Sequence, residues 1–254
     1  KETIVAQKNK SIEDALKVLL EIAGATGPWG SRELARSLHM DPTRTNRFLR
    51  TLTDSGFLIQ DEQRKYSSGP GMKVLAAQAI HGSKFLRCSL PVIEQIGTQN
   101  FIVALGTLHL DKVCYLYHAA EGMTFAEGIG RSNVLLAENS SIGVVMLSEK
   151  SNDEVRDTYK TREVGGYFND IEVLIEKLED VRQKGYCRMV SYPEPDYVSM
   201  AVTVGKPSLG ALAFSRLTPK EADKKIDMLL SKAAEISYRL ENTIMEKGRY
   251  VLQG

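Results

Sequence analysis

Residues 41–56 read DPTRTNRFLRTLTDSG, and this stretch decides the first part of the fold. Asp41 followed by Pro42 predicts a helix start, because the carboxylate accepts hydrogen bonds from first-turn amides and proline fits the first helical position. Gly56 predicts the end of the helix in a left-handed conformation. Helical spacing puts one group of residues on a single face, which we expect to be buried: Thr45, Phe48, Leu49 and Leu52.

The opposite face of this helix carries side chains of the kind that contact phosphates and base edges: Thr43, Arg44, Asn46, Arg47 and Arg50. Arginines on an amphipathic helix are often only a solvated face, so the neighbouring sequence matters. Residues 31–38, SRELARSL, predict a short helix with Ser31 as its N-cap, and two residues separate it from Asp41. This spacing is typical of a helix-turn-helix. Residues 32–50 hold five arginines against two acidic residues, whereas the whole chain has a net charge of +1.

The segments around the helix-turn-helix predict a winged domain over residues 1–70. Ser11 is expected to cap a first helix, with Asp14 as its capping-box acid. We expect the buried stripe of that helix to be Ile12, Ala15, Leu16, Leu19 and Ala23. Residues 57–60 and 65–67 alternate around a polar tip and predict a hairpin, whose Arg64 and Lys65 would reach phosphate.

Residues 68–71, SGPG, predict a domain boundary. A linker helix is expected over residues 71–82, with a narrow apolar stripe suited to pairing with a second copy: Met72, Leu75, Ala76 and Ala79. Residues 85–99 predict another helix, interrupted near Pro91. The remainder, residues 83–254, alternates strands and helices and predicts an α+β domain with an antiparallel sheet.

Composition sets broad limits on the class of protein. The chain has 254 residues, 43% hydrophobic and 26% charged, as in a soluble globular protein of two domains. It contains no apolar run long enough for a transmembrane helix and no signal-peptide pattern, so we expect a cytoplasmic protein without membrane contact. The three cysteines are widely spaced and predict reduced core thiols. No metal site and no cofactor are predicted.

The order of these segments resembles the IclR family of bacterial transcriptional regulators. The resemblance rests on SIEDALKVLLEIA, SRELARSL, TNRFLRTLTDSGFL, the SSIG turn at residues 140–143 and the VRQKGY segment. It implies a winged helix-turn-helix, a linker helix and a GAF-like effector-binding domain, acting as a homodimer or homotetramer on double-stranded operator DNA. A repressor controlled by a small organic acid is the function expected from it.

The predicted DNA contacts combine the helix face, the preceding helix and the wing: Ser31, Arg32, Pro42, Thr43, Arg44, Asn46, Arg47, Arg50, Arg64 and Lys65. Of these, Arg44, Asn46 and Arg47 are expected to enter the major groove. The effector contacts follow from the resemblance and from the small-residue turn that opens a helix: Leu105, Leu136, Ser141, Ile142, Met189, Ser199 and Ser215. Met189 and Ala213 stand where the family often has polar residues, which predicts a pocket that is less polar than usual.

Two alternatives remain open. The C-terminal domain of a DNA-binding protein can serve for dimerisation alone, without a ligand. Cys114 between His109 and His118 also offers a nucleophile near a base, which is what a cysteine-dependent enzyme needs, although no third orienting group is evident and no phosphate-binding or hydrolase motif is present.

Overall fold

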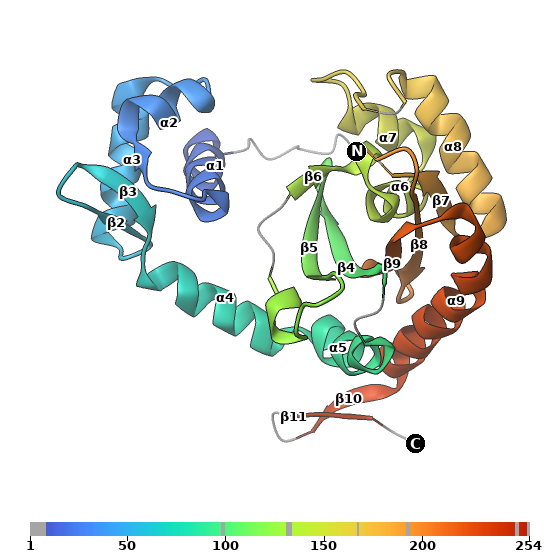
Figure 1. The fold of residues 1–254 in the computed structure, drawn as a ribbon. Coiled ribbons are helices and arrows are strands. Elements are labelled where there is room, and N and C mark those ends of the chain that lie inside the picture. Colours follow the sequence, from blue (N-terminus) through green and yellow to red (C-terminus); the bar gives the residue numbers. More distant parts are fainter. Residues whose placement is uncertain are drawn as a thin grey trace, which may run out of the picture. The chain divides into compact units, whose positions relative to one another are not determined.

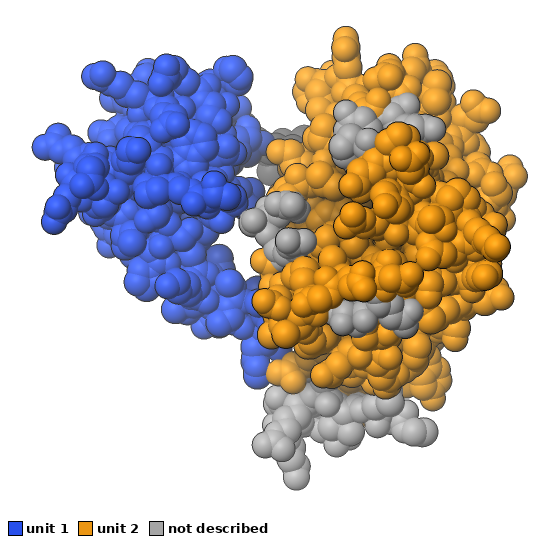
Figure 2. All heavy atoms as spheres, in the orientation of Figure 1, with its two compact units in different colours: residues 1–82 blue, residues 83–254 orange. Residues whose placement is uncertain are grey.

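The computed structural model describes residues 9–97, 100–130, 134–166, 168–191, 194–246 and 249–252. The chain divides into two compact units, residues 1–82 (unit 1) and 83–254 (unit 2), which are coloured separately in Figure 2. Unit 1 is mostly helical, and unit 2 contains an antiparallel sheet with helices (Figure 1). The α+β class predicted from the sequence is confirmed. Within the described residues, no helix combines the length and apolar composition needed to cross a membrane.

Unit 1 contains a helix-turn-helix followed by a hairpin. Its elements are α1 (Lys10–Gly24), β1 (Trp29–Gly30), α2 (Ser31–Ser37), α3 (Pro42–Asp54), β2 (Leu58–Gln60), β3 (Lys65–Ser68) and α4 (Pro70–Gly82). The expected hairpin is β2 and β3, and β1 pairs with the free edge of β3 to make a three-stranded sheet. Strand β1 was not predicted, because two residues are too few to show a strand period.

Helix α1 departs from its predicted caps and stripe. Its N-cap is Asn9, whose side chain accepts from the amides of Ser11 and Ile12, so the prediction of Ser11 as the cap was wrong. The buried residues are Asp14, Val18 and Ile22. Ile12 and Leu16, expected in the core, are 59% and 53% exposed. The helix has apolar residues on two faces, and the sequence pattern alone does not tell which face meets the core.

Helix α4 stands apart from the core of unit 1. Its 13 residues lie where the linker helix was predicted, and none of them is buried within the chain. Val74, Leu75 and Ile80 are each about half exposed, at 56%, 52% and 47%. Exposed large apolar side chains along one helix are typical of a surface that another protein copy or partner covers.

Unit 2 is built on a six-stranded antiparallel sheet with the strand order β6-β5-β4-β9-β8-β7. The strands are β4 (Ile102–His109), β5 (Lys112–Ala119), β6 (Val134–Leu136), β7 (Cys187–Val190), β8 (Val198–Val204) and β9 (Gly210–Leu217). The helices are α5 (Lys84–Ile96), α6 (Ser141–Leu147), α7 (Asn152–Thr158), α8 (Ile171–Lys184) and α9 (Pro219–Asn242), with short 3₁₀ turns η1 (Ala126–Gly128) and η2 (Ala137–Asn139). A C-terminal hairpin, β10 (Thr243–Glu246) with β11 (Arg249–Leu252), was not predicted.

The two faces of the sheet carry separate apolar cores. Helices α5 and α9 pack together on one face, where Phe101 and Phe214 meet edge to face at 4.8 Å. Helices α6 and α8 cover the other face, around Ile142 and Leu178 (Figure 1). Successive strand residues alternate between these cores, so each residue's face can be assigned from its neighbours.

Helix α5 passes through Pro91 without a break, and the predicted interruption there was wrong. Seven of its residues are buried against unit 2, including Val92 and Ile93 directly after the proline. This packing offsets the lost backbone hydrogen bond that proline causes in an isolated helix. The predicted end of this helix at residues 98–99 lies outside the described residues.

Candidate nucleic-acid interface and ligand site

The first turn of α3 is fixed by its cap. Asp41 Oδ1 accepts from the Arg44 amide at 2.8 Å, Pro42 occupies the first turn, and the Thr45 hydroxyl donates to the Asp41 carbonyl at 3.0 Å. At the other end Gly56 has a φ of 76°, the left-handed conformation predicted for it. The cap and the end of the helix therefore follow the sequence signals closely.

The two faces of α3 separate as predicted. Thr45 and Leu49 are fully buried in the core of unit 1, with Phe48 and Leu52 packed at its edge. Five of the predicted DNA contacts on α3 are exposed: Pro42, Thr43, Asn46, Arg47 and Arg50. Among the described residues, no ion pair engages Arg47 or Arg50. Their guanidinium groups are available to phosphate or to base edges.

Helix α2 precedes α3 across a short turn in which His39 has a φ of 50°. The N-cap of α2 is Gly30, not Ser31, and the Glu33 carboxylate accepts from the Gly30 amide at 3.4 Å. The glycine takes the cap position because it also belongs to β1, whose pairing with Lys65 fixes its backbone. Ser31, which is half-buried, and Arg32, which is exposed, thus lie in the first turn of α2.

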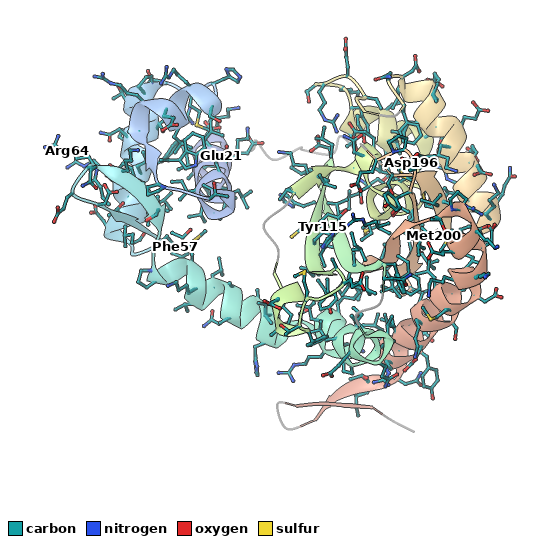
Figure 3. The ribbon with its side chains drawn as sticks, in the orientation of Figure 1. Glu21, Phe57, Arg64, Tyr115, Asp196 and Met200 are labelled. Atoms are coloured by element: carbon teal, nitrogen blue, oxygen red, sulfur yellow. The ribbon has the colours of Figure 1, made fainter. Side chains whose placement is uncertain are left out.

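The hairpin tip carries two basic residues. Arg64 has a φ of 60°, and the Asp61 carboxylate accepts from the Lys65 amide at 2.7 Å, which closes the turn. Both basic side chains are exposed. Figure 3 shows Arg64 at the outer end of the hairpin, pointing away from the helices of unit 1.

Arg44 differs from the other predicted contacts. Its Nη2 atom lies 2.9 Å from the Asp14 carboxylate of α1, and its guanidinium lies 5.6 Å from the centre of the Phe48 ring. The side chain is 38% exposed. It is therefore directed partly into unit 1, although its position on the helix places it beside the exposed face.

The predicted ligand site in unit 2 contains a row of three serine hydroxyls. Ser199 Oγ lies 2.6 Å from Ser141 Oγ and 2.6 Å from Ser215 Oγ. Alternation along β8 and β9 places Ser199 and Ser215 on the sheet face covered by α6, and the pairing of the two strands changes register between Val198 and Met200. The structure thus brings together a residue of α6, one of β8 and one of β9.

The surroundings of this row are apolar. Ile142 and Met189 belong to the core beneath α6, on the same face as Ser199, and Ala213 lies there too. Gly143 lies against η2, where a side chain of any size would meet the Ala137 carbonyl at 2.1 Å. The small residue of this turn is thus required by the packing of η2 against α6.

Leu105 does not belong with this group. It is fully buried in the core on the opposite face, with Phe214 and the residues of α5 and α9. Along β4 it alternates with Ala104, which belongs to the core under α6, so the Leu105 side chain lies on the other face of the sheet. Leu136 is half-buried on the edge strand β6, opposite Lys112.

Sequence reasoning missed a charged cluster next to the serines. Glu138 on η2 is fully buried and accepts from Arg162 Nη1 at 2.6 Å, from Arg162 Nη2 at 2.8 Å and from the Tyr159 hydroxyl at 2.9 Å. Arg162 also pairs with Asp111 in the β4–β5 turn at 2.5 Å. Ser140, which follows η2, bonds the Tyr115 hydroxyl at 3.0 Å. Partners separated by more than twenty residues leave no spacing pattern in a sequence.

The cysteine proposed as a nucleophile has an unsuitable environment. Partial burial raises the pKa of the Cys114 thiol, which keeps it protonated near neutral pH. The ring of His118 packs edge-on against Tyr115 at 5.3 Å. Cys88 and Cys187 are buried, and burial raises the pKa of Cys187 to about 12. These features are those of core thiols.

Residues 11–62 match the model of the IclR helix-turn-helix domain. Over 251 residues the chain is 26% identical to the HTH-type transcriptional regulator KdgR of Escherichia coli, covering 91% of this chain and 93% of KdgR. Residues 11–62 thus carry the helix-turn-helix domain of the IclR family. Over most of its length the chain is similar to a transcriptional regulator, and its fold is that of solved IclR regulators.

Solved IclR-family structures share the fold. An IclR regulator from Alicyclobacillus acidocaldarius is 22% identical, with a TM-score of 0.70 over 91% of this chain and 98% of its own. An IclR homologue from Microbacterium hydrocarbonoxydans, complexed with 4-hydroxybenzoate, is 18% identical, with a TM-score of 0.67 over 91% of this chain and 99% of its own. At such identities the likeness concerns the fold.

Proposed function

We propose that this regulator is a repressor that binds double-stranded operator DNA through α3 and the hairpin of unit 1, and that a small organic acid bound in unit 2 controls it. The observation that carries the DNA-binding assignment is the exposure of Asn46, Arg47 and Arg50 opposite the buried Thr45 and Leu49. A rigid helix with one packed face and one face of unpaired donors suits the major groove. Because such DNA lies in the cytoplasm, we place the protein there.

The contacts divide by the chemistry of their side chains. Asn46 and Arg47, near the middle of α3, are assigned to base edges, since amides pair with adenine and guanidinium groups with guanine. The remaining contacts are assigned to the DNA backbone: Ser31, Arg32, Pro42, Thr43, Arg50, Arg64 and Lys65. Backbone contacts fix the register of the protein but carry no sequence information.

Arg47→Ala tests the assignment. The probe is a duplex that the wild-type protein selects from a randomised library, compared with a scrambled duplex of equal length. The variant should lose roughly 1 to 3 kcal/mol of binding free energy for the selected duplex, and base changes in that duplex should reduce its affinity less than they reduce that of wild type. Arg36→Ala is the matched control, since Arg36 is an exposed arginine of α2 outside the assigned contacts. Wild-type affinity in the Arg47 variant would refute the assignment.

The effector proposal is supported by the hydroxyl row of Ser141, Ser199 and Ser215 within apolar surroundings. Serine hydroxyls donate to a carboxylate, and Ile142 and Met189 suit an apolar or aromatic body. The relative complexed with 4-hydroxybenzoate shows that an aromatic acid is a ligand of one protein with this fold. We therefore propose a small acid of that class, with Leu136 at the edge of the site.

Repression itself is tested separately. A reporter gene placed behind the selected duplex should be expressed less when the wild-type protein is present, and the acid should restore expression. A reporter that rises with the protein would make it an activator.

A further inference from the structure

The ion pair between Asp14 and Arg44 joins α1 to the first turn of α3. The Asp14 side chain is only 6% exposed, although the sequence predicted it as the capping-box acid of α1. Its carboxylate meets Arg44 at 2.9 Å and Lys17 at 3.9 Å. Lys17 belongs to α1 itself, is 51% exposed and is the more distant partner. Arg44 is therefore the main compensation for a buried negative charge.

Arg44 is held at three points. Its amide donates to Asp41 in the helix cap, its guanidinium pairs with Asp14, and the guanidinium lies over the Phe48 ring. Arg47 and Arg50, one and two turns further along α3, have no such partner among the described residues. Arg44 is thus bound within unit 1, whereas Arg47 and Arg50 face outward. Their spacing in the sequence does not reveal this difference.

A buried carboxylate needs its cation. Taking Arg44 away to contact DNA would leave the desolvated Asp14 with only the distant Lys17 as its cation, next to the end of the helix that meets phosphate. The same pair connects α1 and α3 beyond their shared apolar contacts at Val18 and Leu49. A change in the angle between these helices would displace Asn46 and Arg47 together.

We propose that Arg44 is a positioning residue: its pair with Asp14 sets the orientation of α3 in which Asn46 and Arg47 read bases, and it does not itself contact a base. This inference rests on the proposed DNA-binding function and replaces the sequence-based expectation that Arg44 enters the major groove. Asp14 and Arg44 form one specificity-determining unit, although Asp14 lies outside the helix-turn-helix.

The test compares Arg44→Gln, Asp14→Asn and the double variant Asp14→Asn/Arg44→Gln in the full chain. For each, affinity for the selected and scrambled duplexes is measured over a series of KCl concentrations, together with the melting temperature. Lys17→Gln is the control, because it removes only the distant, exposed partner of Asp14. A neutral amide pair in the double variant keeps the contact between α1 and α3 without a buried charge.

We expect Arg44→Gln to melt earlier and to discriminate between the two duplexes about tenfold less than wild type, because the helix loses its orientation. The double variant should recover discrimination to within about threefold, with an unchanged dependence of log Kd on log salt concentration. Lys17→Gln should behave as wild type. If Arg44→Gln does not fold, the double variant still gives the decisive comparison.

Two outcomes overturn the proposal. If the double variant bound the selected duplex as weakly as Arg44→Gln does, and its dependence of log Kd on log salt concentration were lower than that of wild type by about 0.9, Arg44 would be a direct DNA contact. An Asp14→Asn variant that binds both duplexes more tightly, with a steeper slope, would mean that Asp14 withholds Arg44 from DNA. Failure of the proposed function is distinct, since the wild-type protein would then select no duplex or Arg47→Ala would have no effect.

Discussion

At the scale of single residues, Glu138 in unit 2 accepts four hydrogen bonds from described residues. Burial raises the pKa of its carboxyl, but the hydrogen bonds from Arg162, Tyr159 and the Gly165 amide outweigh burial and leave the pKa below its ordinary value. Because η2 leads directly into Ser140 and Ser141, this cluster holds the turn from which the proposed effector site is built. Its loss should therefore affect both stability and ligand binding.

Glu138→Gln should lower the free energy of unfolding by about 2 to 3 kcal/mol, since a buried ion pair loses one partner while Arg162 keeps Asp111. Glu172→Gln is the control, because its pair with Arg156 is 65% and 42% exposed and contributes about 1 kcal/mol at most. Urea denaturation followed by circular dichroism measures both. Equal effects of the two substitutions would contradict the structural role of Glu138.

The same residue predicts a pH dependence. A carboxyl whose pKa is lower in the folded than in the unfolded state stabilises the fold above its unfolded pKa, near 4.5, and loses that contribution as the pH falls through the folded pKa. The stability difference between wild type and Glu138→Gln should hence be constant near neutral pH and shrink in acid below pH 4.5. If the difference in unfolding free energy between wild type and Glu138→Gln grew in acid, the predicted pH dependence would be wrong.

Local signals at this scale were predictable from the sequence. Asp41, Ser151 and Thr218 cap their helices as the cap patterns indicate, each within three residues of its partner. Asp14 and Glu138 were not predictable, because their partners lie 30 and 24 residues away and are set by tertiary packing. The serine row was anticipated as a group, but the change of register between β8 and β9 beside Ser199 was not.

At the scale of elements, the strongly periodic helices α3, α8 and α9 were predictable, whereas α1 was assigned the wrong face. Periodicity finds an apolar stripe, but α1 has two, and the core side includes the charged Asp14. Exposed Ile12, Leu16 and Leu20 form the other stripe. Short strands such as β1 depend on a neighbouring strand for their existence and cannot be read from two residues.

The apolar stripe of helix α4 leads to a prediction about how copies of the protein associate. We expect at least a homodimer in which Met72, Leu75, Ala76 and Ala79 meet a second copy, because a single head covers too little DNA to specify a site. Leu75→Glu should weaken the dimer by about 2 kcal/mol or more by placing a charge in the seam. Ala77→Glu, which puts the same charge on the opposite face of α4, should change it little.

Light scattering over a range of protein concentrations measures the dimer dissociation of both variants, and the selected duplex measures their operator affinity. If Leu75→Glu dimerised and bound the selected duplex as wild type does, this face of α4 would not be the dimer interface. Equal losses in Leu75→Glu and Ala77→Glu would assign the interface to the whole helix instead of the predicted stripe.

At the scale of the whole molecule, regulation requires that an acid bound in unit 2 alter DNA binding by unit 1. Such coupling is reciprocal: if the acid weakens DNA binding by some factor, the selected duplex weakens binding of the acid by the same factor. A protein whose unit 2 only dimerises has no such linkage. The alternative is therefore tested by measuring acid binding with and without the duplex.

The probe for that measurement is found by thermal shift, because a ligand that binds only the folded protein raises its melting temperature. The panel begins with 4-hydroxybenzoate, the ligand of one relative, and extends to smaller acids and to aromatic acids without the hydroxyl. If no acid in the panel shifts the melting temperature, the dimerisation-only alternative gains support over the effector proposal.

Ser199→Ala then locates the site. Ser199 is the middle member of the hydroxyl row and hydrogen-bonds both of its neighbours. Removing its hydroxyl should lower the affinity for the acid about tenfold, as expected for a lost hydrogen bond to a charged group. Ser231→Ala is the control, since Ser231 is exposed on α9, away from the face covered by α6. Calorimetry on the full chain gives the affinities. Unchanged binding in Ser199→Ala would place the acid elsewhere, whereas weaker binding together with a smaller effect of the acid on operator affinity would tie the hydroxyl row to regulation.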